Sequence, residues 1–443
     1  MSQLSKVGVR DLFIDAILGL CSESSDAWTT ALRKKGEVQA QGKALPTTRD
    51  EEWRFTPLGP LLEVNYDVAP NPTLSESSLA PYIFDGVAAR LVFINGRLNK
   101  DLSYLPELSE GVHVGPLAEL KGEFGENLRG IVGTIAAPED NVFTALNQAH
   151  LRPEDTPVIN VDKDVSVELP IHLLFVSTSV VAESGASFVT FPRVLVRALS
   201  GGNVTVVEDH ISLFEPSSYF VGSVIEASVA ENATVSHIKV LRDHADACHI
   251  ARSAAKVAQH GQYKSVTASL GGRLTRHDIQ AIQEGDATHC ELHGLAFLTD
   301  QQLSDTHSCM DHAKPHGTSD QIHKVVVGGR ARAVFNGKIF VRQDAQKTAA
   351  EQLSRSLLLS ERALVYTKPQ LEIFADDVRC THGATIGQIE GEELFYLQSR
   401  GVDPQTARQT LTFAFAGEVL EKIPVKPLKD ALRLEILSKL SEL

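Results

Sequence analysis

The chain has 443 residues, 43% of them hydrophobic and 22% charged, which is typical of an ordinary soluble protein with a large core. Its 42 basic and 56 acidic residues give a formal charge of −14, which argues against nucleic acid as the main partner. No apolar run approaches the ~20 residues of a membrane-spanning helix, so we expect no membrane partner.

Residues 1–150 are expected to form an N-terminal helical and mixed region. The first residues lack the cationic start and small-residue cleavage site of a signal peptide, which favours a cytoplasmic location. Apolar positions recur at helical spacing between Leu12 and Leu32, and "SSDAW" supplies N-cap residues for a second helix. In "EEWRF", Trp53 and Phe55 stand among charges. Either they anchor the segment to another surface or they pack locally under a loop.

Residues 151–388 are expected to form a mainly β core, a parallel β-helix or solenoid. Short β-rich runs begin near Leu91 and alternate with turn pairs, without the long crossovers that a parallel α/β sheet needs. The stretch is long for one sandwich, which favours a solenoid, although no clean repeat period is visible. The turn pairs that we expect are Asn95-Gly96, Glu231-Asn232, Gly271-Gly272, Gly328-Gly329 and Asn336-Gly337.

Residues 389–443 are expected to be helical and to dock a partner. Gly401 is a helix stop, and Asp403 followed by Pro404 is typical of a new helix start. An apolar face in the next helix is predicted to remain free for a partner; its residues are Phe413, Phe415, Val419 and Leu420. The alternative is that these helices simply cap the solenoid.

One segment, "DTHSCMDHAKPHGTSDQIH", is dense in potential metal ligands. Metal sites need several nitrogen, sulfur or oxygen donors within bonding range, and this segment supplies them at close sequence spacing. Because of Pro315 and Gly317 we expect a loop, in which solvated histidines are the alternative to a metal site. The candidate ligands are His307, His312 and His316, with Cys309, Asp311 and His323 nearby.

A second candidate is Cys380 and His382 in "DDVRCTHGAT". If this stretch is a strand, both side chains point to the same face. They are then half of a metal site, a catalytic dyad, or a packed cysteine beside a hydrogen-bonded histidine. Neither residue makes a complete site alone. The common catalytic motifs, including the G-x-x-x-x-G-K-[ST] phosphate loop and the G-x-S-x-G elbow, do not occur in the sequence.

Several long blocks resemble the SufB/SufD family of iron–sulfur cluster assembly proteins, and of its two branches the SufD branch. These blocks are residues 357–402, residues 334–352, "HSCMDHAKPHGTSDQIHK", "EEWRFTPL" and "LVFINGRL". The resemblance implies a right-handed parallel β-helix flanked by helical regions. It implies a non-enzymatic scaffold that pairs with SufB through the β-helix and holds the ATPase SufC through its C-terminal helices. A homodimer is a further expectation for the isolated chain.

The resemblance also implies that His382 faces SufB at the cluster-assembly site, with Cys380 as a helper or a packing residue. A transient iron–sulfur cluster or iron would be shared with SufB, and no bound cofactor is expected in the isolated chain. Neutral imidazole suits iron and releases it more readily than thiolate does, which fits a cluster that must be passed on. Ala363 stands where SufB chains carry a cysteine that is thought to hold the nascent cluster.

Two alternatives to this function stay open. The first is a SufB-like paralogue that holds the cluster itself. The second is a β-helix enzyme acting on carbohydrate, which would need clustered carboxylates in a groove. The sequence shows no repeated acidic positions of that kind.

Overall fold

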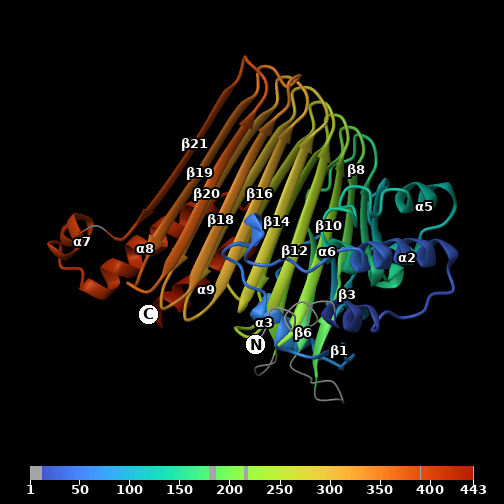
Figure 1. The fold of residues 1–443 in the computed structure, drawn as a ribbon, viewed down its shortest axis with the longest axis horizontal. Helices are drawn as coiled ribbons and strands as arrows, with labels where there is room; N and C mark the ends of the chain where they lie inside the picture. The colour runs from blue at the N-terminus through green and yellow to red at the C-terminus, as the bar shows by residue number, and fades with distance from the viewer. Residues whose placement is uncertain (1–11, 179–185, 214–217, 390, 443) are drawn as a thin grey trace.

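The computed structural model describes residues 12–178, 186–213, 218–389 and 391–442. Two large sheets lie face to face and run along the whole length of the molecule (Figure 1). The chain alternates between them, and successive strands within each sheet are parallel through most of its length. The prediction of a parallel β-solenoid with helical regions at both ends is therefore confirmed.

We call the 11-stranded sheet A and the 10-stranded sheet B. In spatial order, sheet A contains β20 (Leu364–Ile373), β18 (Arg332–Val341), β16 (Leu303–His312), β14 (Leu274–Gln283), β12 (Cys248–Val257), β10 (Tyr219–Val229), β8 (Arg193–Ala198), β5 (Pro157–Val161) and β4 (Val112–Pro116), with β1 (Tyr66–Val68) and β7 (Ser187–Thr190) beside this path. In the same way, sheet B contains β21 (Arg379–Gly387), β19 (Ala349–Leu358), β17 (Thr318–Val327), β15 (His289–Leu298), β13 (Gln262–Ser269), β11 (Thr234–Arg242), β9 (Asn203–Leu213), β6 (Ile171–Thr178), β2 (Ala89–Ile94) and β3 (Arg97–Tyr104).

The repeat length of the solenoid varies from rung to rung, which hides its period in the sequence. The residues that stack on one another in sheet A are separated by 26, 29, 29 and 32 positions; they are Cys248, Leu274, Leu303, Arg332 and Leu364. Strand lengths stay near ten residues while the turns between them change in length. The sequence therefore has no fixed repeat period, even though the rungs stack regularly.

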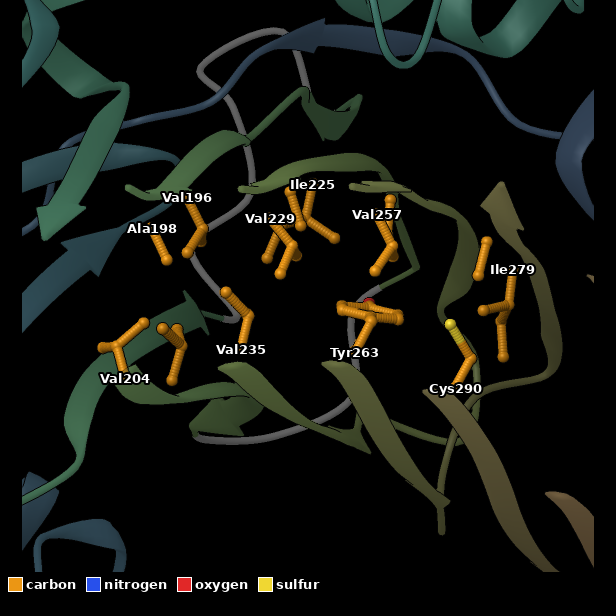
Figure 2. Close-up of a cluster of buried hydrophobic side chains, with 14 of the residues drawn as sticks. Val196, Ala198, Val204, Ile225, Val229, Val235, Val257, Tyr263, Ile279 and Cys290 are labelled. Carbon is orange, nitrogen blue, oxygen red and sulfur yellow. The ribbon is translucent and has the colours of Figure 1, made fainter. Parts of the chain in front are cut away.

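The hydrophobic core lies between the two sheets and consists mainly of small β-branched side chains (Figure 2). Because alternate residues of a strand point to opposite faces, each rung sends every second side chain inward. Val196, Ile225 and Val257 from sheet A meet Val235 and Tyr263 from sheet B. Each of these five residues is at most 2% exposed. Parallel stacking repeats this contact from rung to rung and makes the core continuous.

Most of the predicted turn pairs lie in turns. Asn95 and Gly96, with φ of 48° and 79°, connect β2 and β3 in a hairpin. Gly272 and Gly329 also have positive φ, which glycine adopts without steric cost. The prediction for Asn336-Gly337 is wrong, because both residues lie inside β18. Gly337 instead faces the side chain of Gln352, which occupies the space that a Cβ atom would need.

The N-terminal region contributes both helices and strands. Helix α2 (Ala27–Gln41) begins at Asp26, whose carboxylate accepts a hydrogen bond from the Thr29 backbone nitrogen at 2.8 Å. Residues 12–18 are also helical. The remaining short helices are η1 (Glu51–Trp53), α3 (Gly59–Leu62), α4 (Glu76–Leu79), η2 (Ala80–Tyr82), η3 (Leu117–Glu119), α5 (Gly122–Arg129), α6 (Val142–Ala149) and η4 (Pro153–Asp155). Helices α2, α5 and α6 gather at the end of the solenoid where β8 lies (Figure 1).

The "EEWRF" segment anchors to the outer face of sheet A, so the first of the two interpretations is confirmed. The Trp53 ring lies 5.6 Å from the Phe143 ring, and the Arg276 guanidinium lies 3.9 Å from the centre of the Trp53 ring. The Phe55 ring stacks on Tyr366 with their centres 3.9 Å apart. These contacts tie a segment near residue 55 to a strand about 300 residues further along the chain.

The C-terminal helices are α7 (Gly391–Gln398), α8 (Pro404–Leu420) and α9 (Lys426–Ser441). The predicted start of α8 is confirmed, since the Asp403 carboxylate accepts from the backbone nitrogens of Gln405 and Thr406. Helices α8 and α9 lie on the outer face of sheet B, where α8 contacts β15 and β17. Among the described residues, none of the helices combines the length and the apolar character that crossing a membrane requires.

The prediction that α8 keeps an apolar face free for a partner is wrong, because this face packs against the solenoid. Val419 and Leu420 are 1% and 0% exposed and belong to the core between α8, α9 and sheet B. Phe413 and Phe415 are partly buried against the same core. The Lys324 ammonium group lies 4.4 Å from the centre of the Phe415 ring and donates to the Phe415 carbonyl at 3.0 Å. These apolar residues therefore hold the helices on the solenoid.

Candidate interface site at the open end of the solenoid

Strands β20 and β21 end their sheets, and in the described part of the chain no further strand pairs with either of them. An unpaired strand edge presents backbone N–H and C=O groups to a partner. Strand β21 is also largely exposed: of its nine residues, only Cys380 and Gly383 are partly buried. The two edges lie at the same end of the molecule (Figure 1), and they form what we call the open end.

Cys380 and His382 lie on β21 and point to the same side of it. Their stacking partners on β19 are Ala350 and Gln352, both of which are buried in the interior. Cys380 packs against the core, and burial raises the pKa of its thiol, partly offset by a backbone hydrogen bond at Ala350. His382 is exposed, because no rung of the described chain follows β21 to cover it. The thiol is therefore partly buried, and the imidazole is the more accessible ligand.

His307 is an ion-paired side chain and does not offer a free nitrogen to a metal. Its Nδ1 lies 3.1 Å from Glu52 Oε2, and its Nε2 lies 3.0 Å from Asp305 Oδ1. Burial alone would lower its pKa, but the Asp305 charge and the hydrogen bonds to both carboxylates raise the pKa to about 9. Asp305 also accepts from Arg276 Nη1 at 2.6 Å and from the Thr56 hydroxyl at 2.5 Å. This cluster fastens the "EEWRF" segment to sheet A.

The other histidines of that segment do not meet. The loop prediction is wrong for most of it, because residues up to His312 belong to β16 and residues from Thr318 onward to β17. His312 is buried, its Nε2 lies 3.0 Å from Ser319 Oγ, and burial lowers its pKa to about 4. His316 lies exposed in the short turn. In the described ranges, no three His, Cys, Asp or Glu side chains are grouped closely enough to hold a metal.

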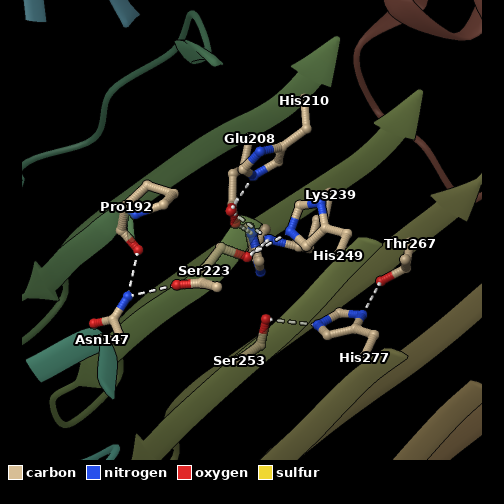
Figure 3. A network of polar contacts seen from close by, with 12 residues as sticks. Asn147, Pro192, Glu208, His210, Ser223, Lys239, His249, Ser253, Thr267 and His277 are labelled. Atoms are coloured by element: carbon tan, nitrogen blue, oxygen red, sulfur yellow. Dashed lines mark hydrogen bonds and ion pairs between the residues drawn. The ribbon is translucent and has the colours of Figure 1, made fainter. Parts of the chain in front are cut away.

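A buried polar network that was not predicted lies inside the solenoid. We call it the lumen cluster; it consists of Glu208, His210, Ser223, His237, Lys239, Asp243 and His249. Figure 3 labels Glu208, His210, Ser223, Lys239 and His249 of this cluster. Glu208 forms an ion pair with Lys239 and hydrogen bonds with His210 Nε2 at 2.7 Å and His237 Nε2 at 2.9 Å. His249 bridges Asp243 and Ser223, each at 2.8 Å.

Charge pairing keeps the Glu208 carboxylate of the lumen cluster ionised despite its burial. Burial opposes ionisation of Glu208, yet the Lys239 charge and the two histidine hydrogen bonds hold its pKa well below the usual range. Burial, with the Lys239 charge, lowers the pKa of His210 to about 4, so this ring is neutral at pH 7. Ser223, His249 and Asp243 have the connectivity of a hydrolase triad, but all three are at most 4% exposed. The arrangement therefore stabilises the interior.

The sequence signal for the lumen cluster is weak but present. Glu208 and His210 are two apart within the β-rich run "NVTVVEDHISL", and alternation places both on the inner face with Val206. Charged residues at inward positions of a strand are rare unless they are paired. Which side chains pair with them is decided by the next rungs, which bring in His237 and Lys239 from β11.

Comparison with known proteins agrees with this architecture. The family model of the SUF system FeS cluster assembly SufBD core domain matches residues 180–415, and that of the SufBD protein N-terminal region matches residues 9–173. An iron–sulfur cluster assembly SufBD family protein of Synechocystis sp. is 37% identical over 410 residues, covering 90% of this chain and 89% of the relative. The iron–sulfur cluster assembly protein SufD of Escherichia coli is 32% identical over 387 residues, covering 87% of each chain.

The solenoid, its helical ends and these matches define a class of protein, the components of the SUF system of iron–sulfur cluster assembly. Within that class, the chain belongs to the SufBD family. A SufBD family protein of Mycobacterium leprae is more distant, at 26% identity over 396 residues and 88% of both chains. Its match extends over the same large share of the chain.

Proposed function

We propose that the chain is the non-ATPase scaffold subunit of a SUF assembly complex, with SufB at the open end and the ATPase SufC on the C-terminal helices. The observation that carries the proposal is the open end itself, where β20 and β21 leave two strand edges unpaired within the described chain. A partner with a similar solenoid would continue both sheets, as in β-strand addition. The names SufD and SufBD of the relatives support this choice of complex.

His382 would act as an iron ligand at that interface, and the cluster would be the cargo of the complex. The ring is exposed on the edge strand, close to where a partner would pair, so ligands from both chains can share one cluster. Imidazole binds iron and exchanges readily, whereas the partly buried Cys380 thiol has a raised pKa and would lose packing contacts on binding. Ala363 is 4% exposed and supplies no thiolate, which favours the scaffold over a SufB-like paralogue.

The decisive experiment measures iron and sulfide in complexes copurified with variants of this chain. His382→Ala is expected to lower the cluster content at least several-fold, and Cys380→Ala much less. His316→Ala is the matched control, because His316 is an exposed histidine in a turn outside the proposed site. All three variants should keep their thermal midpoints within a few degrees. Full cluster content in the His382→Ala complex would refute the role of this residue.

Partner pairing at the open end has its own test, which uses a proline on β21. The Arg379 backbone nitrogen donates to Thr348 at 2.8 Å. N–H groups alternate in direction along a parallel strand, so that of Ala384 points away from β19. Ala384→Pro therefore removes a donor on the free edge only. It should leave the isolated chain folded and weaken copurification with SufB, and unchanged copurification would refute pairing through β21.

SufC docking is proposed on the exposed apolar residues of α7 and α9. Phe395 and Tyr396 on α7 are 71% and 57% exposed, and Leu434 on α9 is 69% exposed. Phe395→Ser and Leu434→Ser should reduce capture of SufC, and Leu169→Ser, an exposed leucine in the segment before β6, is the control. Truncation before Gly401 is not a clean test, because it would uncover the core that α8 and α9 share with sheet B. Undiminished capture would place the docking surface elsewhere.

A further inference from the structure

The interior residue next to His382 has polar groups that nothing in the described chain satisfies. Gln352 on β19 is 2% exposed, and neither its Oε1 nor its Nε2 has a hydrogen-bond partner among the described residues. Buried amides without partners are costly, so each calls for an explanation. The stacking partner of Gln352 on the following rung is His382.

A column of polar side chains leads to this position from deeper in the solenoid. Gln321 on β17 is the stacking partner of Gln352 on the preceding rung. The Ser308 hydroxyl donates to Gln321 Oε1 at 2.7 Å, which holds that amide and leaves its Nε2 without a partner among the described residues. The column therefore runs from Ser308 through Gln321 and Gln352 to His382.

The backbone opposite the column makes room for the Gln352 amide. Gly337 on β18 faces it, and a Cβ atom there would clash with Gln352 Nε2. Parallel strands lie ~4.8 Å apart, so identical or similar amide side chains on neighbouring rungs are within reach of one another and form ladders. Gln321 Nε2 and Gln352 Oε1 are both without a partner among the described residues. A small rotation that let the first donate to the second would turn Gln352 Nε2 toward the following rung. The residue on that rung is His382.

We propose that Gln352 is the positioning residue of His382, hydrogen-bonding one ring nitrogen and so fixing the tautomer and orientation in which the other nitrogen meets its ligand. Histidines that bind metals commonly have the second nitrogen held by a neighbouring polar group, and that group sets which nitrogen is free. The consequence for assembly rests on the role proposed above for His382. The hydrogen bond between Gln352 and His382 does not depend on that role. It is tested first on the isolated full-length chain.

The test compares Gln352→Leu with a matched glutamine-to-leucine change at the same end of the solenoid. Gln370→Leu is that control, because Gln370 lies on β20 and donates to Asn336 Oδ1 at 3.0 Å, outside the Ser308–His382 column. The readout is the pair of ring ¹⁵N chemical shifts of His382, assigned by their loss in His382→Ala. One tautomer should dominate in the wild type, Gln352→Leu should shift the ring toward a mixture, and Gln370→Leu should leave it unchanged. Identical His382 shifts in Gln352→Leu and the wild type would overturn the proposal.

Cluster content then separates this inference from the proposed function. In the complex, Gln352→Leu should lower iron and sulfide several-fold but less than His382→Ala does. If His382→Ala abolishes the cluster and Gln352→Leu changes the ring without changing the cluster, the positioning role is overturned. If His382→Ala itself leaves the cluster intact, the proposed function fails, and the ring shifts still decide the hydrogen bond.

Discussion

Glu226 offers the sharpest test of how the N-terminal region is held on the solenoid. Its fully buried carboxylate accepts from the backbone nitrogens of Gly133, Ile135 and Ala136 at 2.9 to 3.1 Å. Arg193 donates to it through Nε at 2.9 Å and Nη2 at 2.7 Å. One side chain of β10 therefore accepts the hydrogen bonds of a turn in the N-terminal region and of a buried guanidinium.

Glu226→Ala should cost at least about 4 kcal/mol of unfolding free energy. Removing one partner of a buried ion pair costs ~3–5 kcal/mol, and each stranded backbone donor adds ~1–3 kcal/mol before water enters the space. Arg193→Met should cost less, because the three backbone donors would still satisfy the Glu226 carboxylate. Glu226→Gln should also cost less, because it keeps an acceptor oxygen and removes only the charge.

The assay is urea unfolding followed by circular dichroism, with the order of midpoints as the result. We expect the midpoint of Glu226→Ala to lie below those of Arg193→Met and Glu226→Gln, which should both lie below the wild type. If Glu226→Ala proves too unstable to purify, the Gln variant still tests the charge contribution. A Glu226→Ala protein within 1 kcal/mol of the wild type would refute the reasoning, since that is below the ~3–5 kcal/mol cost of breaking a buried pair.

Three further predictions follow from other parts of the structure. The pKa of His307 is raised to about 9. The contribution of protonated His307 to the free energy of unfolding is therefore complete below pH ~6.5. It is lost as pH rises through 9, which is a loss of about 3 kcal/mol. The thermal midpoint should fall more steeply between pH 6.5 and 9.5 in the wild type than in His307→Gln, and equal slopes would contradict this. Lys239→Met leaves Glu208 buried without its cation and should lower the free energy of unfolding in denaturant by ~3–5 kcal/mol. A loss under 1 kcal/mol would mean that the two histidines beside Glu208 are enough to stabilise its carboxylate. Gly96→Ala should lower the thermal midpoint, because φ is 79° there and the new Cβ would lie 3.2 Å from the Thr190 side chain; an unchanged midpoint would show that the hairpin relaxes.

Some of these features follow from the sequence because they depend on a few neighbouring residues. The turn at Asn95-Gly96 needs only residues that tolerate positive φ. The helix start at Asp403 needs only a side chain that reaches the next backbone nitrogens. The strand containing Cys380 and His382 places both on one side because alternation along a strand is a local rule. Local rules also indicate the solenoid, since many short strands follow one another without helical crossovers.

Which side chains meet depends on the stacking register of the rungs, because stacking joins residues 26 to 32 positions apart at intervals that vary. That register pairs Glu208 with Lys239 and aligns Gln352 with His382, and no local pattern encodes either pairing. It also separates His307, which is held by Glu52 and Asp305, from the histidines close to it in sequence. The spacing of apolar residues along α8 is enough to predict an apolar face, whereas only the contact of α8 with sheet B shows that this face is buried.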